Sequence, residues 1–249
     1  MNKVYGNFDE AVRDIPDGAS IMIGGFGGPG GCPQNLIKAL DRQGAKELTI
    51  IGCAPAISGL ITSKLQVPYV DAALLIEHKR VKKLIASFPF YAIVNRKSIT
   101  EEAYLNGEFA LEVIPQGTMI ERIRAGGAGI GGFYTPTGVG TLAENHLGGY
   151  YKPGVLPLLV PKEKKVIAGK EYLLELPLKA DFAFVWAYQA DKLGNLIYRR
   201  ACRSFSPVVA TAAKVTIAEV EKVVEPGELD PDHIHTPSLY VQRIVGIEK

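Results

Sequence analysis

"SIMIGGFGGPGGCPQNLIKALDRQGAKELTIIG", residues 20–52, is the stretch that decides the fold. The apolar run at its start is typical of a buried strand, and "KELTIIG", residues 46–52, supplies a second strand. The residues between them have a helical pattern, with Pro33 at the first position and Gly44 just past the end. A strand, a crossover helix and a strand within about 30 residues make a βαβ unit, which predicts a parallel sheet with ligands at the carboxyl ends of its strands.

The rest of the chain continues the alternation of helices and strands. The expected helices are residues 7–15, 98–107, 118–127 and 206–214, and the expected strands are 69–76, 82–90, 109–115, 181–191, 194–200, 214–224 and 238–245. Asn7 is expected to cap the first of these helices. The predicted fold class is α/β, an open and mostly parallel sheet flanked by helices with a strand-rich C-terminal part. Residues 1–249 are expected to form a single domain, because no linker or repeat divides them.

Residues 126–141 and 145–166 depart from the alternation of helices and strands. Before the first of them, the helix at 118–127 is expected to begin with a capping box from Thr118 to Glu121 and to stop at Gly126. Residues 126–141 then carry so many glycines and prolines that we expect a long loop, and loops of this length are usually functional. Residues 145–166 are expected to form an irregular excursion whose basic cluster is solvated.

Composition and charge exclude several classes of function. The 249 residues carry a formal net charge of +2 spread over both signs, which gives no argument for binding nucleic acid or an anionic membrane. Cys32, Cys53 and Cys202 are too few and too far apart for a disulfide framework or a zinc site, and His233 and His235 lack a third ligand nearby, so no metal is expected. The acidic N-terminus "MNKVYGNFDEAV" is unlike a targeting peptide, and we expect a cytoplasmic protein.

The glycine-rich segment contains the spacing GxGxxG at Gly25, Gly27 and Gly30. A dinucleotide site also needs an acid after the second strand, but "CAPA" follows residues 48–52, and Pro29 removes an amide from the centre of the cradle. A Walker loop is excluded because no Gly-Lys-Ser/Thr follows. Two interpretations remain: a loop whose amides and helix N-terminus receive an anion or a flat group, and a tight strand-to-helix turn without a ligand.

Four ordered stretches carry a resemblance to a known family. They are "DGASIMIGGFGGPGGCPQNLI" (17–37), "PQGTMIERIRAGGAGIGGFYTPTGVGT" (115–141), "ADFAFVWAYQADKLGNLIYRRACRSFSP" (180–207) and "HIHTPSLYVQRIV" (233–245). Together they resemble the A subunits of the family I coenzyme A transferases, the 3-oxoacid group. The resemblance implies the α/β fold of that family, and it extends along nearly the whole chain.

The resemblance also implies a mechanism and a partner. Such enzymes work by a ping-pong mechanism in which a glutamate of the B half, in a Ser-Glu-Asn-Gly context, forms an acyl anhydride and then a glutamyl-CoA thioester. That tetrapeptide does not occur here, and Glu144 in "TLAENH" lacks the serine and the glycine. The chain is therefore expected to need a partner B chain, in a heterodimer or an α2β2 heterotetramer. Coenzyme A or acyl-CoA is expected as substrate, with no permanently bound cofactor.

Site residues are carried over from the same resemblance. The expected coenzyme A-binding residues are Gly24, Gly25, Phe26, Gly27, Gly28, Pro29 and Gly30, and the substrate-pocket candidates are Gly52, Cys53, Ala54, Gly129, Gly132, Phe133, Tyr134, Thr135 and Gly138. Phe133 and Tyr134 fit a packing role equally well. Cys53 follows the second strand, where a small core or pocket residue and a reactive thiol are both open interpretations.

Three departures from the family pattern lie in these loops. Residues 52–56, "GCAPA", replace the usual Ser-Asn-Asn-Ala-Gly, so two side-chain amides are missing. Gly131 and Gly132 stand where Pro-Ala is usual, and the first glycine segment is one residue longer. The expected activity is the transfer of coenzyme A from an acyl-CoA such as succinyl-CoA to a 3-oxo acid, acetoacetate or 3-oxoadipate. A hydrolase, lyase or decarboxylase of the same fold and a non-catalytic acyl-CoA sensor remain alternatives.

Overall fold

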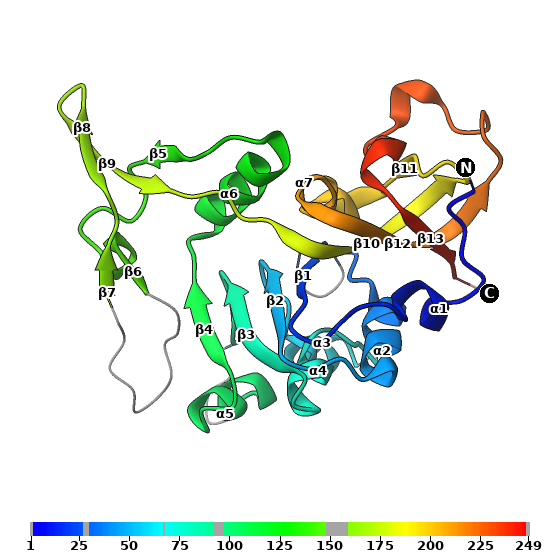
Figure 1. Cartoon of the computed structure of the whole chain (residues 1–249). Coiled ribbons are helices and arrows are strands. Elements are labelled where there is room, and N and C mark those ends of the chain that lie inside the picture. The colour runs from blue at the N-terminus through cyan, green and yellow to red at the C-terminus, as the bar shows by residue number, and fades with distance from the viewer. Residues whose placement is uncertain (1, 27–29, 67, 92–96, 148–158, 248–249) are drawn as a thin grey trace.

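The computed structural model describes residues 2–26, 30–66, 68–91, 97–147 and 159–247 (Figure 1). Its helices are α1 Phe8–Val12, α2 Gln34–Gln43, α3 Ser58–Leu65, α4 Ala73–Glu77, α5 Ile99–Leu105, α6 Gln116–Ala128 and α7 Ser206–Thr211. Its strands are β1 Ser20–Ile23, β2 Leu48–Gly52, β3 Val81–Ala86, β4 Ala110–Val113, β5 Phe133–Thr135, β6 Asn145–Leu147, β7 Leu159–Pro161, β8 Lys164–Ile167, β9 Lys170–Glu175, β10 Ala180–Asp191, β11 Leu196–Ile197, β12 Ala213–Val224 and β13 Arg243–Gly246. Short 3₁₀ turns are η1 Leu142–Glu144, η2 Arg200–Arg203, η3 Pro231–His233 and η4 Ser238–Tyr240.

The main sheet confirms the predicted α/β class. Its strands follow the order β13-β12-β10-β1-β2-β3-β4 and every pair along that path is parallel, while β11 pairs antiparallel with β10. On one side of β1 the strands β2, β3 and β4 follow one another in sequence order. On the other side of β1 lies β10, which comes much later in the chain. The strand order therefore reverses at β1, and the carboxyl ends at such a reversal are where open α/β sheets bind ligands.

The sheet separates two hydrophobic cores. Ile21 and Ile23 of β1 pack with α1, α2, α4 and α5, whereas Met22 packs on the opposite face with α6 and α7. This alternation follows from the two-residue period of a strand, and it gives the layers seen in Figure 1. α6, with 13 residues, falls short of the roughly 20 that a bilayer requires, and no other described helix has the length and apolarity to cross one.

The prediction for the helix near residue 118 is wrong at both ends. α6 begins after Pro115 and ends at Gly129, which has a φ of 70° in the left-handed region. Thr118 lies buried within the helix, so it forms no capping box. The helix continues through Gly126 and Gly127, and close packing explains why these positions are glycines. A Cβ on Gly127 would lie 2.8 Å from the Cβ of Thr211 in α7. The expected loop at 126–141 is therefore helical at its start, and β5 forms within it.

The expected strand at 69–76 is also wrong, because α4 forms there. A short apolar run does not distinguish a buried strand from a buried helix. Asp71 favours the helix, since its carboxylate accepts hydrogen bonds from the N–H groups of Ala73, at 2.9 Å, and Ile57, at 2.6 Å. The expected strand at 238–245 is shorter than predicted, because η4 precedes β13.

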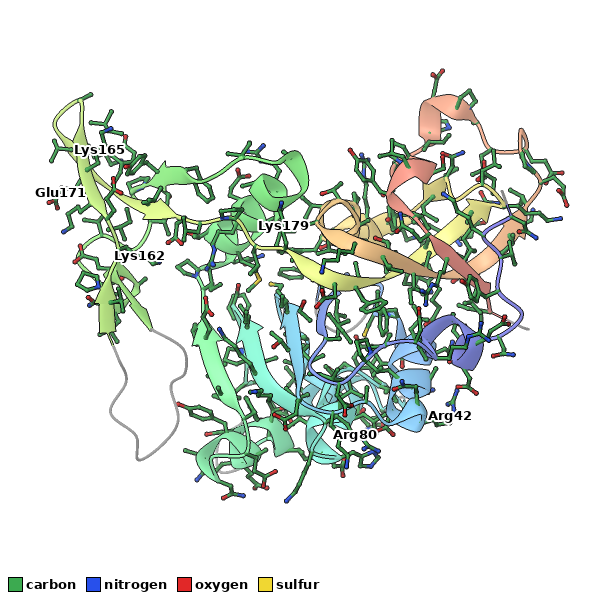
Figure 2. All side chains as sticks on the ribbon, in the orientation of Figure 1. Arg42, Arg80, Lys162, Lys165, Glu171 and Lys179 are labelled. Carbon is green, nitrogen blue, oxygen red and sulfur yellow. The ribbon has the colours of Figure 1, made fainter. Side chains whose placement is uncertain are left out.

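An arm extends from the β4 edge of the body. It consists of the antiparallel sheet β5-β9-β8 and the pair β6-β7. The prediction that residues 145–166 are irregular is therefore wrong for β6, β7 and β8, and residues 148–158 lie outside the described residues. Figure 2 shows Lys162, Lys165 and Glu171 on this arm. Its base carries a buried chain of ion pairs, Lys83–Glu112–Arg122–Glu175–Lys162, that joins β3, β4 and α6 to the arm.

Candidate functional site

A small pocket opens at the carboxyl ends of β1 and β2. Its lining residues are Ile23, Gly24, Gly25, Phe26, Cys32, Cys53, Ala54, Pro55, Tyr69 and Asp71. The structure thus brings the first glycine segment together with the segment after β2, as expected from the strand ends. Gly52 directly precedes this lining, and a Cβ there would lie 3.1 Å from Pro55. The expected residues Gly27, Gly28 and Pro29 lie outside the described residues.

The described glycines of the segment are required by its own packing. Gly25 has a φ of 85°, and a Cβ there would lie 2.7 Å from the carbonyl oxygen of Gly30. A Cβ on Gly24 would lie 2.8 Å from Ser206 Oγ, and one on Gly30 would lie 2.8 Å from Phe26 N. Real side chains do not fit at these distances, so the tight turn accounts for these glycines whether or not a ligand binds.

The backbone amides at the start of the segment already have protein acceptors. The N–H of Gly24 donates to β10 at 2.8 Å, and the N–H of Gly25 donates to Ser206 Oγ at 3.1 Å. The N–H of Phe26 donates to the carbonyl of Gly30 at 3.2 Å. These three amides are therefore not available to an anion.

A buried carboxylate occupies the N-terminus of α2. Glu219 of β12 is 2% exposed and accepts hydrogen bonds from Asn35 N at 2.8 Å, Asn35 Nδ2 at 2.8 Å and Leu36 N at 3.1 Å. Burial raises the pKa of Glu219 to about 7, against the lowering effect of those bonds. The idea that this helix N-terminus receives a substrate anion is therefore not supported. The sequence signal that was missed is the acid within the apolar run "VTIAEV".

The polar residues on the floor of the pocket are uncharged or engaged with the backbone. Burial raises the pKa of Asp71 to about 6 against the lowering effect of hydrogen bonds, including those from the N–H groups of Ala73 in α4 and Ile57 just before α3. Burial also raises the pKa of the Cys32 thiol, whose Sγ lies 3.7 Å from the carbonyl of Val70. The pKa of Tyr69 is raised by its own burial and by the neighbouring Cys32.

Cys53 is placed where the sequence predicts, but its environment does not activate it. The thiol is 3% exposed, and burial raises its pKa to about 11. The Cys53 carbonyl accepts hydrogen bonds from Ser87 N at 3.1 Å and Phe88 N at 2.8 Å, which ties this turn to the end of β3. Because thiolates are the reactive species, the structure favours a packing role for Cys53.

The second set of expected pocket residues lies in the arm. Phe133, Tyr134 and Thr135 form β5 and pair with β9, and the Tyr134 hydroxyl donates to Glu163. Gly129 ends α6, Gly132 packs against the Glu175 carbonyl and Gly138 packs against Ala143. The structure does not bring these residues to the pocket at β1 and β2.

Glu144 and the paired histidines have local roles. Glu144 accepts hydrogen bonds from Gly140 N at 2.6 Å and from Lys164 at 2.8 Å, and these contacts lower its pKa. His235 Nδ1 accepts the N–H of Tyr198 at 2.9 Å, and His233 pairs with its neighbour Asp230. Among the described residues, no three His, Cys, Asp or Glu side chains gather as metal ligands.

Comparison with known proteins gives one consistent family. The sequence matches the family described as Coenzyme A transferase over residues 5–246. One relative is the A subunit of the probable succinyl-CoA:3-ketoacid coenzyme A transferase of Bacillus subtilis (strain 168), which is 44% identical over 248 residues, covering 98% of this chain and 90% of that protein. Another is the A subunit of the 3-oxoadipate CoA-transferase of Pseudomonas putida, which is 42% identical over 250 residues, covering 99% and 94%.

One solved structure resembles this chain in fold. The acyl-CoA transferase apoenzyme of Escherichia coli O157:H7 superposes with a TM-score of 0.79 at 21% identity, covering 99% of this chain and 47% of that one. The chain thus spans about half the length of that enzyme. Because the family match extends over residues 5–246 and the two relatives are 44% and 42% identical over at least 90% of their own lengths, the chain belongs to the coenzyme A transferase family.

Proposed function

We propose that this chain is the A subunit of a heteromeric coenzyme A transferase that works in the cytoplasm. Residues 1–249 would form one unit that, with a B subunit, moves coenzyme A from an acyl-CoA such as succinyl-CoA to a 3-oxo acid. Acetoacetate and 3-oxoadipate are the acceptors that the names of the two relatives support. Their full-length matches at 44% and 42% identity make this assignment stronger than fold similarity alone.

The observation that carries the proposal is the lack of a competent nucleophile among the described residues of the pocket. Asp71 is buried and bonded to backbone N–H groups, Cys53 is a buried thiol with a pKa of about 11, and Glu144 lies on the arm bonded to Lys164. Covalent catalysis needs an accessible and activated group. A glutamate of the partner subunit would supply it.

The reaction would proceed through that glutamate in balanced steps. Its carboxylate attacks the acyl-CoA carbonyl, giving an acyl-glutamyl anhydride and free coenzyme A thiolate. The thiolate then attacks the glutamyl carbonyl, which releases the first carboxylate and leaves a glutamyl-CoA thioester. The acceptor carboxylate reverses these two steps and leaves as the new acyl-CoA. Each step conserves an activated acyl group, so the energy of the thioester is retained.

This chain would contribute the wall against which the coenzyme A thioester lies. Gly24 and Gly25 line the pocket with backbone, although both are buried by the packing of the turn. Phe26 beside them exposes 44% of its area, and its ring stacks on Phe205 at 5.8 Å. The lack of side chains on the two glycines would let a ligand in the pocket approach the backbone closely. Residues 129–138 of the arm would form a separate contact region.

Expression alone and together with a B subunit tests the proposal. The isolated chain should not transfer coenzyme A from succinyl-CoA to acetoacetate or 3-oxoadipate, and the pair should do so with parallel double-reciprocal plots. Incubation of the pair with succinyl-CoA should trap a thioester that is sensitive to borohydride or hydroxylamine. Full activity of the lone chain, or hydrolysis of acyl-CoA with no need for an acceptor, would contradict it.

A further inference from the structure

The glycine segment is held at both ends by side chains from the C-terminal part of the chain. At its start, Ser206 Oγ of α7 accepts the N–H of Gly25 at 3.1 Å, across 181 residues of sequence. At its end, Glu219 of β12 accepts the N–H of Asn35 at 2.8 Å, across 184 residues. The described residues at both ends of the segment are therefore held by elements that follow β10 in the chain.

Glu219 takes the position that an external anion occupies at other helix N-termini. The first N–H groups of a helix have no partner within the helix, and the helix dipole favours negative charge there. In α2 two of these N–H groups, those of Asn35 and Leu36, donate to one carboxylate oxygen, while Asn35 Nδ2 donates to the other. The site is filled from within, so it holds the helix in place and does not bind substrate.

We propose that Glu219 is a positioning residue of the coenzyme A site, which fastens the N-terminus of α2 and thereby sets the exit of the glycine segment. This inference rests on the proposed function in one respect, the contact of that segment with the coenzyme A thioester. Cys32 of the pocket lies three residues before Asn35, so a displaced helix N-terminus moves the pocket lining directly. Glu219 itself does not line the pocket.

Two conservative substitutions separate hydrogen bonding from charge. Glu219→Gln removes the charge but keeps the reach: its Oε1 accepts both backbone N–H groups, and the Asn35 amide rotates so that its oxygen accepts from Gln Nε2. Glu219→Asp keeps the charge, but its carboxylate is one methylene short of the helix. Glu221→Gln and Glu221→Asp, on the same strand at an exposed position, are the matched controls.

The variants are assayed in the two-subunit enzyme with succinyl-CoA and acetoacetate. Glu219→Asp should raise the KM for succinyl-CoA at least tenfold with kcat within about threefold, whereas Glu219→Gln and both controls should stay within threefold of the original in both constants. Equal damage by Gln and Asp, or damage by Gln alone, would show that charge or bulk packing matters and would overturn the proposal. An unchanged KM for Glu219→Asp would overturn it as well.

Hydrogen exchange of the peptide covering residues 30–43 provides a readout that does not depend on activity. Its first turn should exchange at least tenfold faster in Glu219→Asp than in Glu219→Gln. If exchange is faster in Glu219→Asp than in Glu219→Gln but the unsubstituted enzyme transfers no coenzyme A, the proposed function fails while the role of Glu219 in placing α2 stands. If transfer is intact but exchange is the same in all variants, the positioning role is wrong.

Discussion

Replacing Arg122 of α6 with methionine should destabilise the chain strongly, because this arginine is the centre of the buried ion-pair chain at the base of the arm. Its Nε donates to the carbonyl of Leu176 at 2.8 Å, its NH1 lies 3.3 Å from Glu112, and its Nε lies 3.9 Å from Glu175. Loss of one charged partner from a buried network costs about 3–5 kcal/mol. The lower end applies here, since Lys83 and Lys162 still face the two carboxylates.

A loss of about 3 kcal/mol corresponds to a fall of roughly 6–12 °C in Tm for a chain of this size. Urea unfolding followed by circular dichroism measures it directly. Arg124→Met is the control, because Arg124 lies on the same helix and pairs with Glu121 at 2.8 Å, but is exposed to solvent. The control should leave the unfolding midpoint nearly unchanged, since exposed pairs are screened. Equal midpoints for the two variants would refute the claim that the buried network fastens the arm.

Three further outcomes follow from the same structure. Gly127→Ala should destabilise α6 because its Cβ would lie 2.8 Å from the Thr211 Cβ, whereas Gly117→Ala in the open first turn should stabilise it by up to about 1 kcal/mol; opposite signs in urea melts check this. The pKa of Glu219 is raised from 4.5 to about 7, so between these pH values the folded state binds a proton that the unfolded state has lost. The free energy of unfolding of the unsubstituted protein, relative to that of Glu219→Gln, should therefore fall by roughly 3 kcal/mol as the pH rises from 4.5 to above 7. Urea titrations of both proteins at several pH values measure this, and a difference independent of pH would contradict it. Cys53→Ser should keep kcat within a few-fold; a loss of three orders of magnitude would point to thiol chemistry instead.

Local signals were enough to predict the architecture. The run of 20–52 carries a strand, a helix with Gly44 at its left-handed end and a second strand, and all three form as expected. The helix α4 could not be predicted from its apolar run, although the acid in "YVDAALLI" was a usable sign of a helix start. α6 was misread because its glycines are dictated by contact with α7 and the segment before β10, which no local pattern records.

The position of the candidate pocket could be predicted from the sequence, but the hydrogen bonds and charges around it could not. Strand ends placed Gly24 and Cys53 at one pocket, because parallel strands present their carboxyl ends at one edge. The partner of the α2 N-terminus is Glu219, which is 184 residues away from Asn35 in sequence. The sequence around Asn35 and the sequence around Glu219 contain no pattern that predicts their contact. The same holds for the arm, where β5 and β9 are separated by the expected excursion.

The glycine segment shows how a spacing can arise without the function usually attached to it. A dinucleotide cradle needs free amides and an open helix N-terminus. Here the amides of Gly24, Gly25 and Phe26 donate to the protein, and Glu219 fills the start of α2. What the described part of the segment presents to the pocket is the backbone of Gly24 and Gly25 and the side chain of Phe26. Under the proposed function the nucleophile comes from the B subunit, which agrees with the buried and bonded state of Asp71 and Cys53 at this pocket.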